Sequence, residues 1–179
     1  RLEDFADGKF DGAVIHARAG LLIPYLSERW FSLFGHAVNE AERLGLEIFI
    51  YDEDGWPSGF AGGIVPASGD EYRLKRLKTG CIKSSAPYER LVAVYRRSGG
   101  AFSEISYPES RDGDLFLWYD IDPDYADLLS EETVRRFIDS THEQYRLRFS
   151  DRFGTTIKGF FTDEPQLSGY LPWSPLLEK

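Results

Sequence analysis

The stretch GFFTDEP, Gly159 to Pro165, decides how the rest of the sequence is interpreted. It closes the run TIKGFF, which starts at Thr156 and is rich in β-branched and aromatic residues, and this pattern predicts a buried strand. The run stops at two acids, Asp163 and Glu164, with a proline directly behind them. A carboxylate pair at the end of a buried strand can present an active site. Alternatively, Asp163 is a helix cap or turn residue and Pro165 begins the next segment.

Two earlier segments end in the same way. The segment Ala13–Ile15 predicts a short buried strand that delivers His16 and Arg18 just past its apolar core. The segment Leu46–Tyr51 predicts a second strand. The three acids that follow it are Asp52, Glu53 and Asp54. Because the carboxyl ends of parallel strands lie on one side of an α/β sheet or barrel, where ligands bind, we expect these polar residues to share one site.

Two helices are predicted between these strands. Ser27 has the chemistry of an N-cap and Gly45 that of a C-terminal stop, and apolar residues recur between them at helical spacing. The first strand, this helix and the second strand therefore form a parallel crossover unit. The second helix starts at the N-cap Ser130 and stops before Gly154. Its predicted inner face consists of Val134, Phe137, Ile138, Thr141 and Tyr145.

The remaining segments have a different composition. The loop from Asp54 to Gly63 contains four glycines around two aromatic residues, so its backbone can approach a ligand closely. From Asp70 to Asp122, β-rich runs alternate with polar turns, which predicts a small antiparallel insertion with no helix beyond a turn near Tyr72 to Leu77. The proline-containing tail around Trp173 predicts irregular loop.

Composition excludes several functions. A formal charge of −9 argues against nucleic acid as a partner, because phosphates are bound by clustered Lys and Arg. No apolar stretch approaches the length of a membrane span, so we expect a soluble protein, cytoplasmic or periplasmic or secreted, without a membrane partner. The single Cys81 excludes an intramolecular disulfide and a Cys-rich zinc site. Aromatic residues make up 15% of the chain, and flat rings beside carboxylates suit a polyhydroxylated ligand.

The acids after the second strand can also serve without any catalytic role. Asp52, Glu53 and Asp54 can form a solvated acidic turn, or an oxygen-ligand site for calcium or magnesium, although their spacing does not match an EF-hand. A metal-dependent hydrolase would use Asp52, Asp54 and Asp163 as ligands. The P-loop, Rossmann, HExxH and GxSxG motifs do not occur in the sequence.

The histidines and their neighbours can be purely structural. His16 can be a half-buried histidine whose hydrogen bonds are satisfied, with Arg18 as its surface neighbour. Trp56 can belong to the core of its loop. His36 and His142 lie within helical patterns, and we assign both to structure.

Cleavage of a glycosidic bond needs one carboxylic acid that protonates the leaving oxygen and a second carboxylate that acts as base or nucleophile. We choose Glu164 as the acid. Partial desolvation at the end of a buried strand and the adjacent charge of Asp163 would both favour its protonated form. Asp163 can instead orient a neighbouring group or bind sugar hydroxyls.

Four segments carry a resemblance when they are taken together: VIHARAGLLIPYLSERWF, LGLEIFIYDEDGWPSGFAGG, SEETVRRFIDSTHEQYRLRF and IKGFFTDEP. They resemble a group of bacterial glycoside hydrolases related to the α-L-rhamnosidases of family 106. The similarity runs from Gly12 to Pro165 apart from the β-rich insertion, and YDEDGWPSGFAGG and FTDEP are its most specific parts.

The resemblance implies a (β/α)8 TIM barrel, a carbohydrate substrate and hydrolysis through paired carboxylates. Calcium is the one cofactor that it suggests, and no residue is assigned as a metal ligand. It supports Glu164 as the catalytic acid. The resemblance also implies that His16, Arg18, Asp52, Glu53 and Trp56 bind the substrate. Asp163, which can bind sugar hydroxyls, completes the predicted substrate-binding residues.

A complete barrel takes about 250 residues, so we expect this chain of 179 to hold only the N-terminal part. Residues 1–69 and 123–179 would supply its β/α units, and residues 70–122 the insertion. The second carboxylate is then expected on a later strand, the isolated fragment is expected to be inactive, and its open sheet edges would allow self-association. A noncatalytic carbohydrate-binding module and a metal-dependent hydrolase stay open as alternatives.

Overall fold

The computed structural model describes residues 1–166 and 171–178, and the chain is mixed α/β. Its helices and strands are, in order, α1 (Leu2–Asp7), β1 (Gly12–Ile15), α2 (Glu28–Leu44), β2 (Glu47–Tyr51), β3 (Arg73–Gly80), β4 (Leu91–Ser98), β5 (Ala101–Glu104), β6 (Leu115–Ala126), α3 (Glu131–Phe137), α4 (Glu143–Phe149), β7 (Ile157–Phe161) and β8 (Leu171–Trp173). Among the helices described, none has the length and apolar character needed to cross a membrane.

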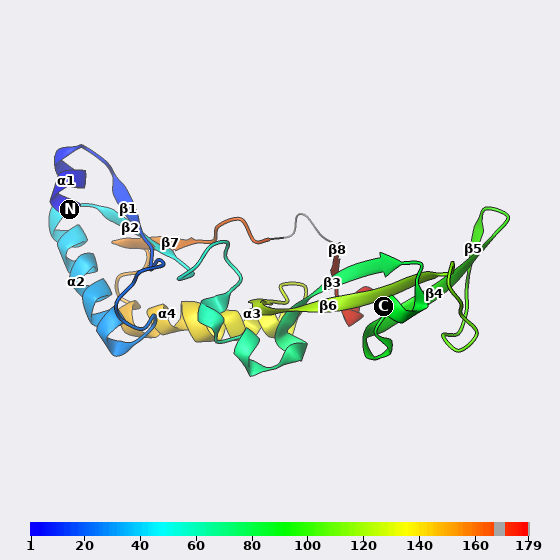
Figure 1. Ribbon diagram of the computed structural model, residues 1–179. Helices are drawn as coiled ribbons and strands as arrows, with labels where there is room; N and C mark the ends of the chain where they lie inside the picture. The colour runs from blue at the N-terminus through cyan, green and yellow to red at the C-terminus, as the bar shows by residue number, and fades with distance from the viewer. Residues whose placement is uncertain (167–170, 179) are drawn as a thin grey trace.

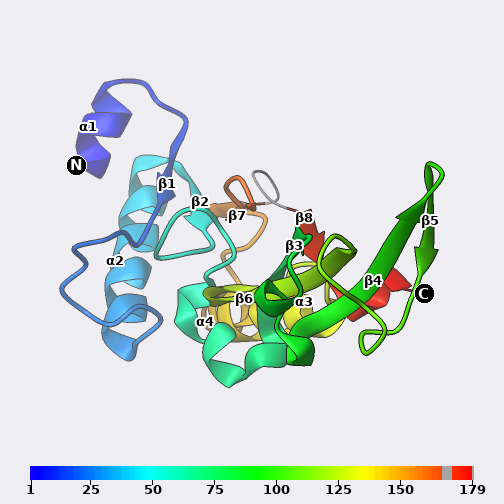
Figure 2. The same ribbon diagram turned by 45° about the vertical axis from the view of Figure 1, so that its right-hand side comes forward.

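The strands form two separate sheets. A three-stranded parallel sheet has the order β1-β2-β7, and a five-stranded antiparallel sheet has the order β5-β4-β6-β3-β8. Figures 1 and 2 show the parallel sheet and α2 at one end of an elongated molecule and the antiparallel sheet towards the other. The three strands predicted to be parallel are confirmed.

The predicted first helix is also confirmed, together with both of its ends. The Ser27 hydroxyl accepts a hydrogen bond from the Trp30 backbone N–H at 3.2 Å, which satisfies one of the free donors of the first turn. Gly45 ends the helix in the left-handed conformation, with φ of 70°.

The second predicted helix is divided into three parts: α3, the π-helical segment Ile138–His142, and α4. Phe137 and Tyr145 are buried as predicted. The prediction for Ile138 is wrong, because its side chain is 43% exposed. It follows Phe137 directly, which places it about 100° further around the helix and off the buried stripe.

Helices α2 and α4 cover one face of the parallel sheet. On this face the fully buried residues Ile48, Ile50 and Ile157 pack in a single cluster with aromatic side chains of both helices. The hydroxyl of the buried Tyr145 on α4 accepts a hydrogen bond from the Trp30 indole at 2.8 Å and joins the two helices. This cluster forms the main hydrophobic core of the chain.

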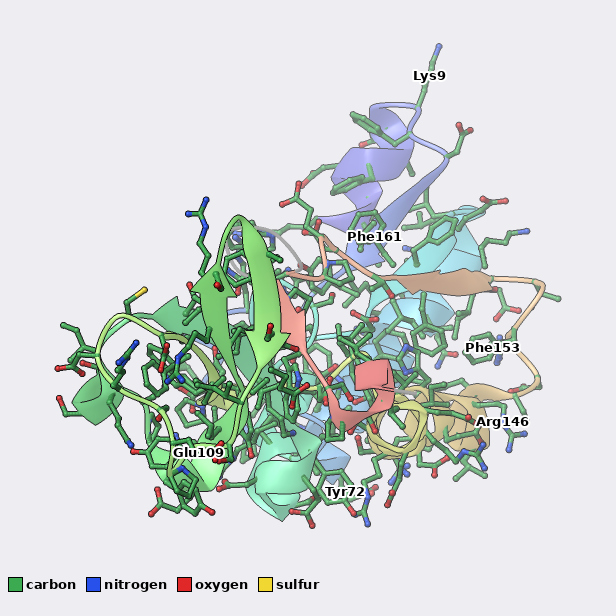
Figure 3. All side chains as sticks on the ribbon, turned by 90° about the vertical axis from the view of Figure 1, so that its right-hand side faces the viewer. Lys9, Tyr72, Glu109, Arg146, Phe153 and Phe161 are labelled. Carbon is green, nitrogen blue, oxygen red and sulfur yellow. The ribbon has the colours of Figure 1, made fainter. Side chains whose placement is uncertain are left out.

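The other face of the parallel sheet is apolar and open. Val14 pairs with Phe49 in the ladder, and Phe161 pairs with Tyr51 two residues further along β2, so these side chains share one face. Val14, Phe49 and Phe161 are 49%, 38% and 44% exposed. Phe153 packs against Phe160, on the helix-covered side of β7, whereas Phe161 lies on the opposite side (Figure 3).

The antiparallel sheet corrects two predictions. The turn expected near Tyr72 to Leu77 is wrong, because a 3₁₀ turn covers only Asp70–Tyr72 and β3 begins at Arg73. The tail is not wholly irregular, since β8 pairs with β3 and Trp173 stacks on Tyr119 of β6 with 4.4 Å between ring centroids. The part of the tail from 167 to 170 lies outside the described residues.

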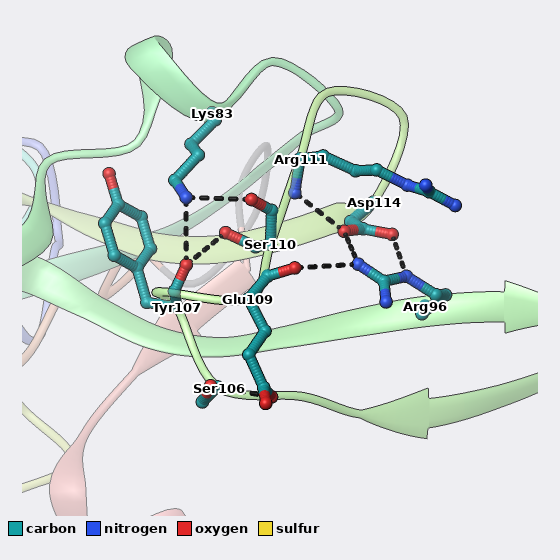
Figure 4. A network of polar contacts seen from close by, with 8 residues as sticks. All are labelled: Lys83, Arg96, Ser106, Tyr107, Glu109, Ser110, Arg111 and Asp114. Carbon is teal, nitrogen blue, oxygen red and sulfur yellow. Dashed lines mark hydrogen bonds and ion pairs between the residues drawn. The ribbon is translucent and has the colours of Figure 1, made fainter.

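The segment between β5 and β6, residues 105–114, is fastened by polar contacts to β4 and to the turn that begins at Lys83 (Figure 4). The Arg96 guanidinium donates to both carboxylate oxygens of Asp114, at 2.9 and 2.7 Å. The Lys83 ammonium donates to the carbonyls of Tyr107 and Ser110, at 3.0 and 2.8 Å. We call this segment the Asp114 loop.

Candidate functional site

The residues that follow β1, β2 and β7 meet at one edge of the parallel sheet. The His16 ring stacks on Tyr51, with centroids 3.5 Å apart, and its Nε2 lies 3.2 Å from the Gly55 carbonyl oxygen. The Tyr51 hydroxyl donates to Asp163 Oδ2 at 2.8 Å. Burial lowers the pKa of His16, and burial together with the Asp163 hydrogen bond raises the pKa of Tyr51. The convergence predicted for the three strand ends is therefore present.

Asp52 lies beneath this edge and is 1% exposed. Its carboxylate accepts hydrogen bonds from the Ser58 hydroxyl at 2.7 Å and from the Thr162 hydroxyl at 2.6 Å, and His142 Nε2 lies 3.5 Å away. Burial raises the pKa of Asp52, but the donors His142, Thr162 and Ser58 together outweigh it and the pKa is lowered. The solvated acidic turn is thus wrong for Asp52, which is a buried anion that organises its neighbours.

Ser58 joins the loop after β2 to the segment after β7. Its backbone N–H donates to the Asp163 carbonyl at 2.9 Å, and its hydroxyl accepts from the Asp163 N–H at 2.9 Å. Because the same hydroxyl donates to Asp52, one serine fixes two of the predicted site residues relative to each other. No regular secondary structure follows Asp163 in residues 164–166, so Asp163 is not a helix cap in the part of the chain described.

Glu53 is enclosed by its own loop and is 0% exposed. Its carboxylate accepts backbone N–H groups of Asp54, Gly59, Ala61 and Gly62, at 3.1, 3.2, 2.5 and 2.8 Å. Burial raises the pKa of Glu53 to about 7, against the opposing effect of these donors. A carboxylate held in this way has no oxygen free for a sugar, so we assign Glu53 a structural role. We call residues 53–63 the Glu53 loop.

Glu164 has an unusual backbone conformation. Its φ is 43°, in the left-handed region that few residues other than glycine adopt. The chain is held on both sides of it, by the Ser58 contacts to Asp163 and by the Gln166 N–H, which donates to the Tyr125 hydroxyl at 2.8 Å. We expected the Glu164 side chain to be partly buried. This prediction is wrong for the part of the chain described, because the side chain is exposed.

The remaining predicted residues lie around this centre. Arg18 is exposed, and its charge contributes to the lowered pKa of His16. Trp56 is 57% exposed and is not part of a loop core. It lines a cavity of about 680 Å³ between the Glu53 loop and the antiparallel sheet.

Sequence reasoning missed several residues of the site. His142, assigned to structure from its helical pattern, lies in a π-helical segment beside Asp52, and such segments are frequent at functional sites. Ser58 and Tyr125 connect segments that are distant in the chain, and Tyr125 also donates to the Ser58 carbonyl. The sequence carries no local signal for such contacts, because they depend on how the loop folds over the strand ends.

Within residues 1–166 and 171–178, no three His, Cys, Asp or Glu side chains are grouped so that they could hold a metal ion. Asp52 and Asp163 are instead separated by the Ser58 hydroxyl. The described residues therefore do not fit calcium, and they do not support the metal-dependent hydrolase.

Comparison with models of known protein families, with curated proteins and with solved structures finds no match.

Proposed function

We propose that this chain is part of the catalytic domain of a glycoside hydrolase and that Glu164 is its general acid. The observation that carries the proposal is the left-handed conformation of Glu164 at the carboxyl end of β7. Such a conformation costs about 1–3 kcal/mol and persists only where the surrounding structure imposes it, typically at functional sites. Here the contacts from Ser58 and Tyr125 impose it.

The open face of the parallel sheet supports a partial (β/α)8 barrel as the architecture. Within residues 1–166 and 171–178, helices cover one face of the sheet, and the face that carries Val14, Phe49 and Phe161 is apolar. In a complete barrel this inner face is filled by side chains of the other strands. We propose that further strands pair with the edges β1 and β7 and cover it. Pairing of these edges with a second copy of the chain is the competing arrangement.

The proposed chemistry assigns different tasks to the residues of the site. Glu164, exposed at the strand edge, donates its proton to the leaving oxygen of the glycosidic bond. A second carboxylate from a strand that completes the barrel acts as base or nucleophile. Asp52 and Glu53 hold the loop in shape, and in this proposal His16 and Asp163 contact sugar hydroxyls. Aryl α-L-rhamnosides are the first substrates to test, because four segments of the sequence resemble glycoside hydrolases related to the α-L-rhamnosidases.

The substitution Glu164→Gln tests the acid. We expect kcat on aryl glycosides to fall about 10²-fold or more in the full-length polypeptide that contains this segment. The loss should grow as the leaving phenol becomes less acidic, because a poor leaving group depends more on protonation. The matched control is Glu47→Gln, which alters an exposed glutamate at the opposite end of the same sheet and should leave kcat unchanged.

Two results would count against this assignment. Unchanged turnover of every accepted glycoside by Glu164→Gln would remove Glu164 from the chemistry. Tight sugar binding without turnover, in the unmodified protein, would favour a noncatalytic carbohydrate-binding module.

A further inference from the structure

The cavity beside the Glu53 loop is built from two parts of the chain that are distant in sequence. One wall is the loop itself, with Gly55, Trp56 and Phe60. The other wall comes from the antiparallel sheet, with Arg73 at the start of β3 and Asp124 in β6. Its volume of about 680 Å³ lies within the usual range of small-molecule sites.

The loop wall presents an aromatic platform on a fixed backbone. Trp56 is 57% exposed, which is unusual for the largest apolar side chain, so its ring is available to a ligand. The backbone behind it is held because Glu53 accepts the N–H groups of Gly59, Ala61 and Gly62. An exposed indole on a fixed backbone suits a ligand with a flat apolar face and reduces the entropy lost on binding.

The polar groups of the cavity have an acidic balance. Within residues 1–166 and 171–178, the carboxylates of Asp54 and Asp124 make no hydrogen bond or ion pair. The Arg73 guanidinium is already engaged, since it donates to the Pro66 carbonyl at 2.9 Å and to Asp70 at 2.5 Å. Two available acceptors and a neutralised cation favour a ligand that donates hydrogen bonds and disfavour an anion.

The cavity borders the candidate active site through Gly55. Gly55 lines the cavity, and its carbonyl oxygen lies 3.2 Å from His16 Nε2. His16 is stacked on Tyr51, which donates to Asp163 next to Glu164. One residue, Gly55, therefore separates a ligand in the cavity from His16 of the candidate site.

We propose that this cavity is a subsite for an uncharged sugar residue adjacent to the one that is cleaved, and that the antiparallel sheet supplies one of its walls. This proposal rests on the proposed function for the identity of the neighbouring site. The sugar ring stacks its apolar face on Trp56 and donates hydroxyl hydrogen bonds to Asp54 and Asp124. The antiparallel sheet thereby selects the length and charge of the substrate.

Binding to the 179-residue chain tests the subsite without requiring catalysis. The probes are neutral pentasaccharides of glucose, galactose, mannose and rhamnose, with pentagalacturonate as the anionic probe of equal length. We expect at least one neutral probe to shift the indole N–H signal of Trp56 in NMR spectra. The substitution Trp56→Ala should weaken its affinity about tenfold, and Trp56→Phe should weaken it less. Phe102→Ala, which removes another exposed aromatic ring, is the control and should leave affinity unchanged.

The outcomes separate this proposal from the assignment of Glu164. Binding that is unaltered in Trp56→Ala, or no binding of any neutral probe, overturns the subsite. If pentagalacturonate binds more tightly than every neutral probe, the proposed selectivity of the subsite for uncharged sugars is overturned. If the affinity for pentagalacturonate increases in Asp54→Asn or Asp124→Asn, the charge argument is supported. Glu164→Gln should bind the neutral probe normally, so failure of the acid assignment would appear only as unchanged turnover.

Discussion

Two loops of this molecule are organised by a buried carboxylate, and they are organised in opposite ways. The Glu53 loop closes around a carboxylate that accepts four backbone N–H groups, and no cation is among its hydrogen-bond partners in the described chain. The Asp114 loop is closed mainly by an ion pair, in which Arg96 donates to both oxygens of Asp114, and a single backbone N–H, that of Arg111, donates to the same carboxylate. Burial raises the pKa of Glu53 to about 7, whereas the Arg96 guanidinium lowers the pKa of Asp114 to about 2.

The difference shows where the chain concentrates strain. Successive backbone N–H groups converge on one anion only if the loop adopts uncommon conformations, and Ala61 and Gly62 have φ of 51° and 58°. An ion pair with a guanidinium makes a smaller demand, because it is formed by side chains, and the Asp114 loop has one such residue, Gly113 with φ of 95°. The strained loop borders the candidate site, and the ion-paired loop lies near the far end of the molecule (Figure 1).

Removing the Glu53 carboxylate should have the largest effect on stability. In Glu53→Ala, four backbone N–H groups lose their acceptor, and each buried donor left without a partner costs about 1–3 kcal/mol. Because water can enter the vacated space and satisfy some donors, we expect a total loss of roughly 3–5 kcal/mol. Urea unfolding followed by circular dichroism measures it.

The stability of Glu53→Gln should be compared with that of Glu53→Ala. The amide keeps the shape of the side chain but places a donor where N–H groups require an acceptor, so an intermediate loss is expected. A loss in Glu53→Ala below about 1 kcal/mol, which is typical of an exposed side chain, would show that the carboxylate does not hold the loop.

The second prediction uses the pH dependence of the Glu53 loop. The pKa of Glu53 in the folded chain, about 7, lies above its ordinary value of 4.5. Folding therefore favours the protonated form, and the stability associated with this group is complete below pH 4.5 and is lost as the pH rises to about 7. The loss is at most about 3 kcal/mol.

Urea midpoints of the unmodified chain and of Glu53→Gln, measured from about pH 4 to about pH 8, test the sign of this effect. The urea midpoint of the unmodified chain should fall relative to that of Glu53→Gln as the pH rises. Movement in the other direction would mean that the four donors outweigh burial, and the two carboxylates would then respond to pH in the same sense.

The parallel part of the fold could be predicted from sequence because its signals are local. Ser27 and Gly45 mark the two ends of α2, and the apolar runs before His16 and Asp52 mark strands. The convergence of the strand ends then follows from the geometry of parallel sheets. β8 was missed because three residues that pair only with β3 have no periodicity of their own.

The site itself was predicted only in outline. Residue types at the strand ends indicated Asp52 and Glu53, but not that both would be buried, because their partners come from the folding of the loop after β2. Nothing in the sequence around Ser58 indicates that it contacts Asp163, a residue 105 positions away. The identity of a chemical group can be read locally, whereas its exposure depends on tertiary contacts.

The third prediction concerns the connection between the Glu53 loop and Glu164, which has no counterpart at the Asp114 loop. The Tyr125 hydroxyl donates to the Ser58 carbonyl and accepts from the Gln166 N–H. In Tyr125→Phe both groups lose this partner while the ring stays packed, so we expect a loss of about 1–2 kcal/mol. Because Glu164 is then held less firmly, kcat should also fall in the full-length protein, with little change in KM.

A control for this variant is Tyr88→Phe, which alters an exposed tyrosine of the antiparallel region. It should change neither stability nor kcat. An effect of Tyr125→Phe on stability alone would limit Tyr125 to holding the loop.

Gly59 offers an independent check on the same connection. A Cβ at this position would lie 2.2 Å from the Tyr125 ring, and φ at Gly59 is 132°, so Gly59→Ala forces the ring or the loop to move. The variant should therefore lower kcat as Tyr125→Phe does. The control is Gly63→Ala, where φ is 72° and a Cβ would meet no atom within 4 Å, so this variant introduces backbone strain without displacing a neighbour.

The smallest effect is expected at the Asp114 loop. Because the folded pKa of Asp114, about 2, lies below its ordinary value of 3.8, the stability from its ion pair is present above pH 3.8 and is lost as the pH falls to about 2. Asp114→Asn should remove this acid dependence.

Since the loop is fastened separately by Lys83 through the Tyr107 and Ser110 carbonyls, opening of the loop in Asp114→Asn should stay local. Hydrogen exchange should therefore quicken at residues 105–114 while the urea midpoint at neutral pH shifts less than in Glu53→Ala. A larger shift than in Glu53→Ala would reverse the comparison, because the ion pair of Asp114 would then stabilise the fold more than the four backbone N–H groups that bind Glu53.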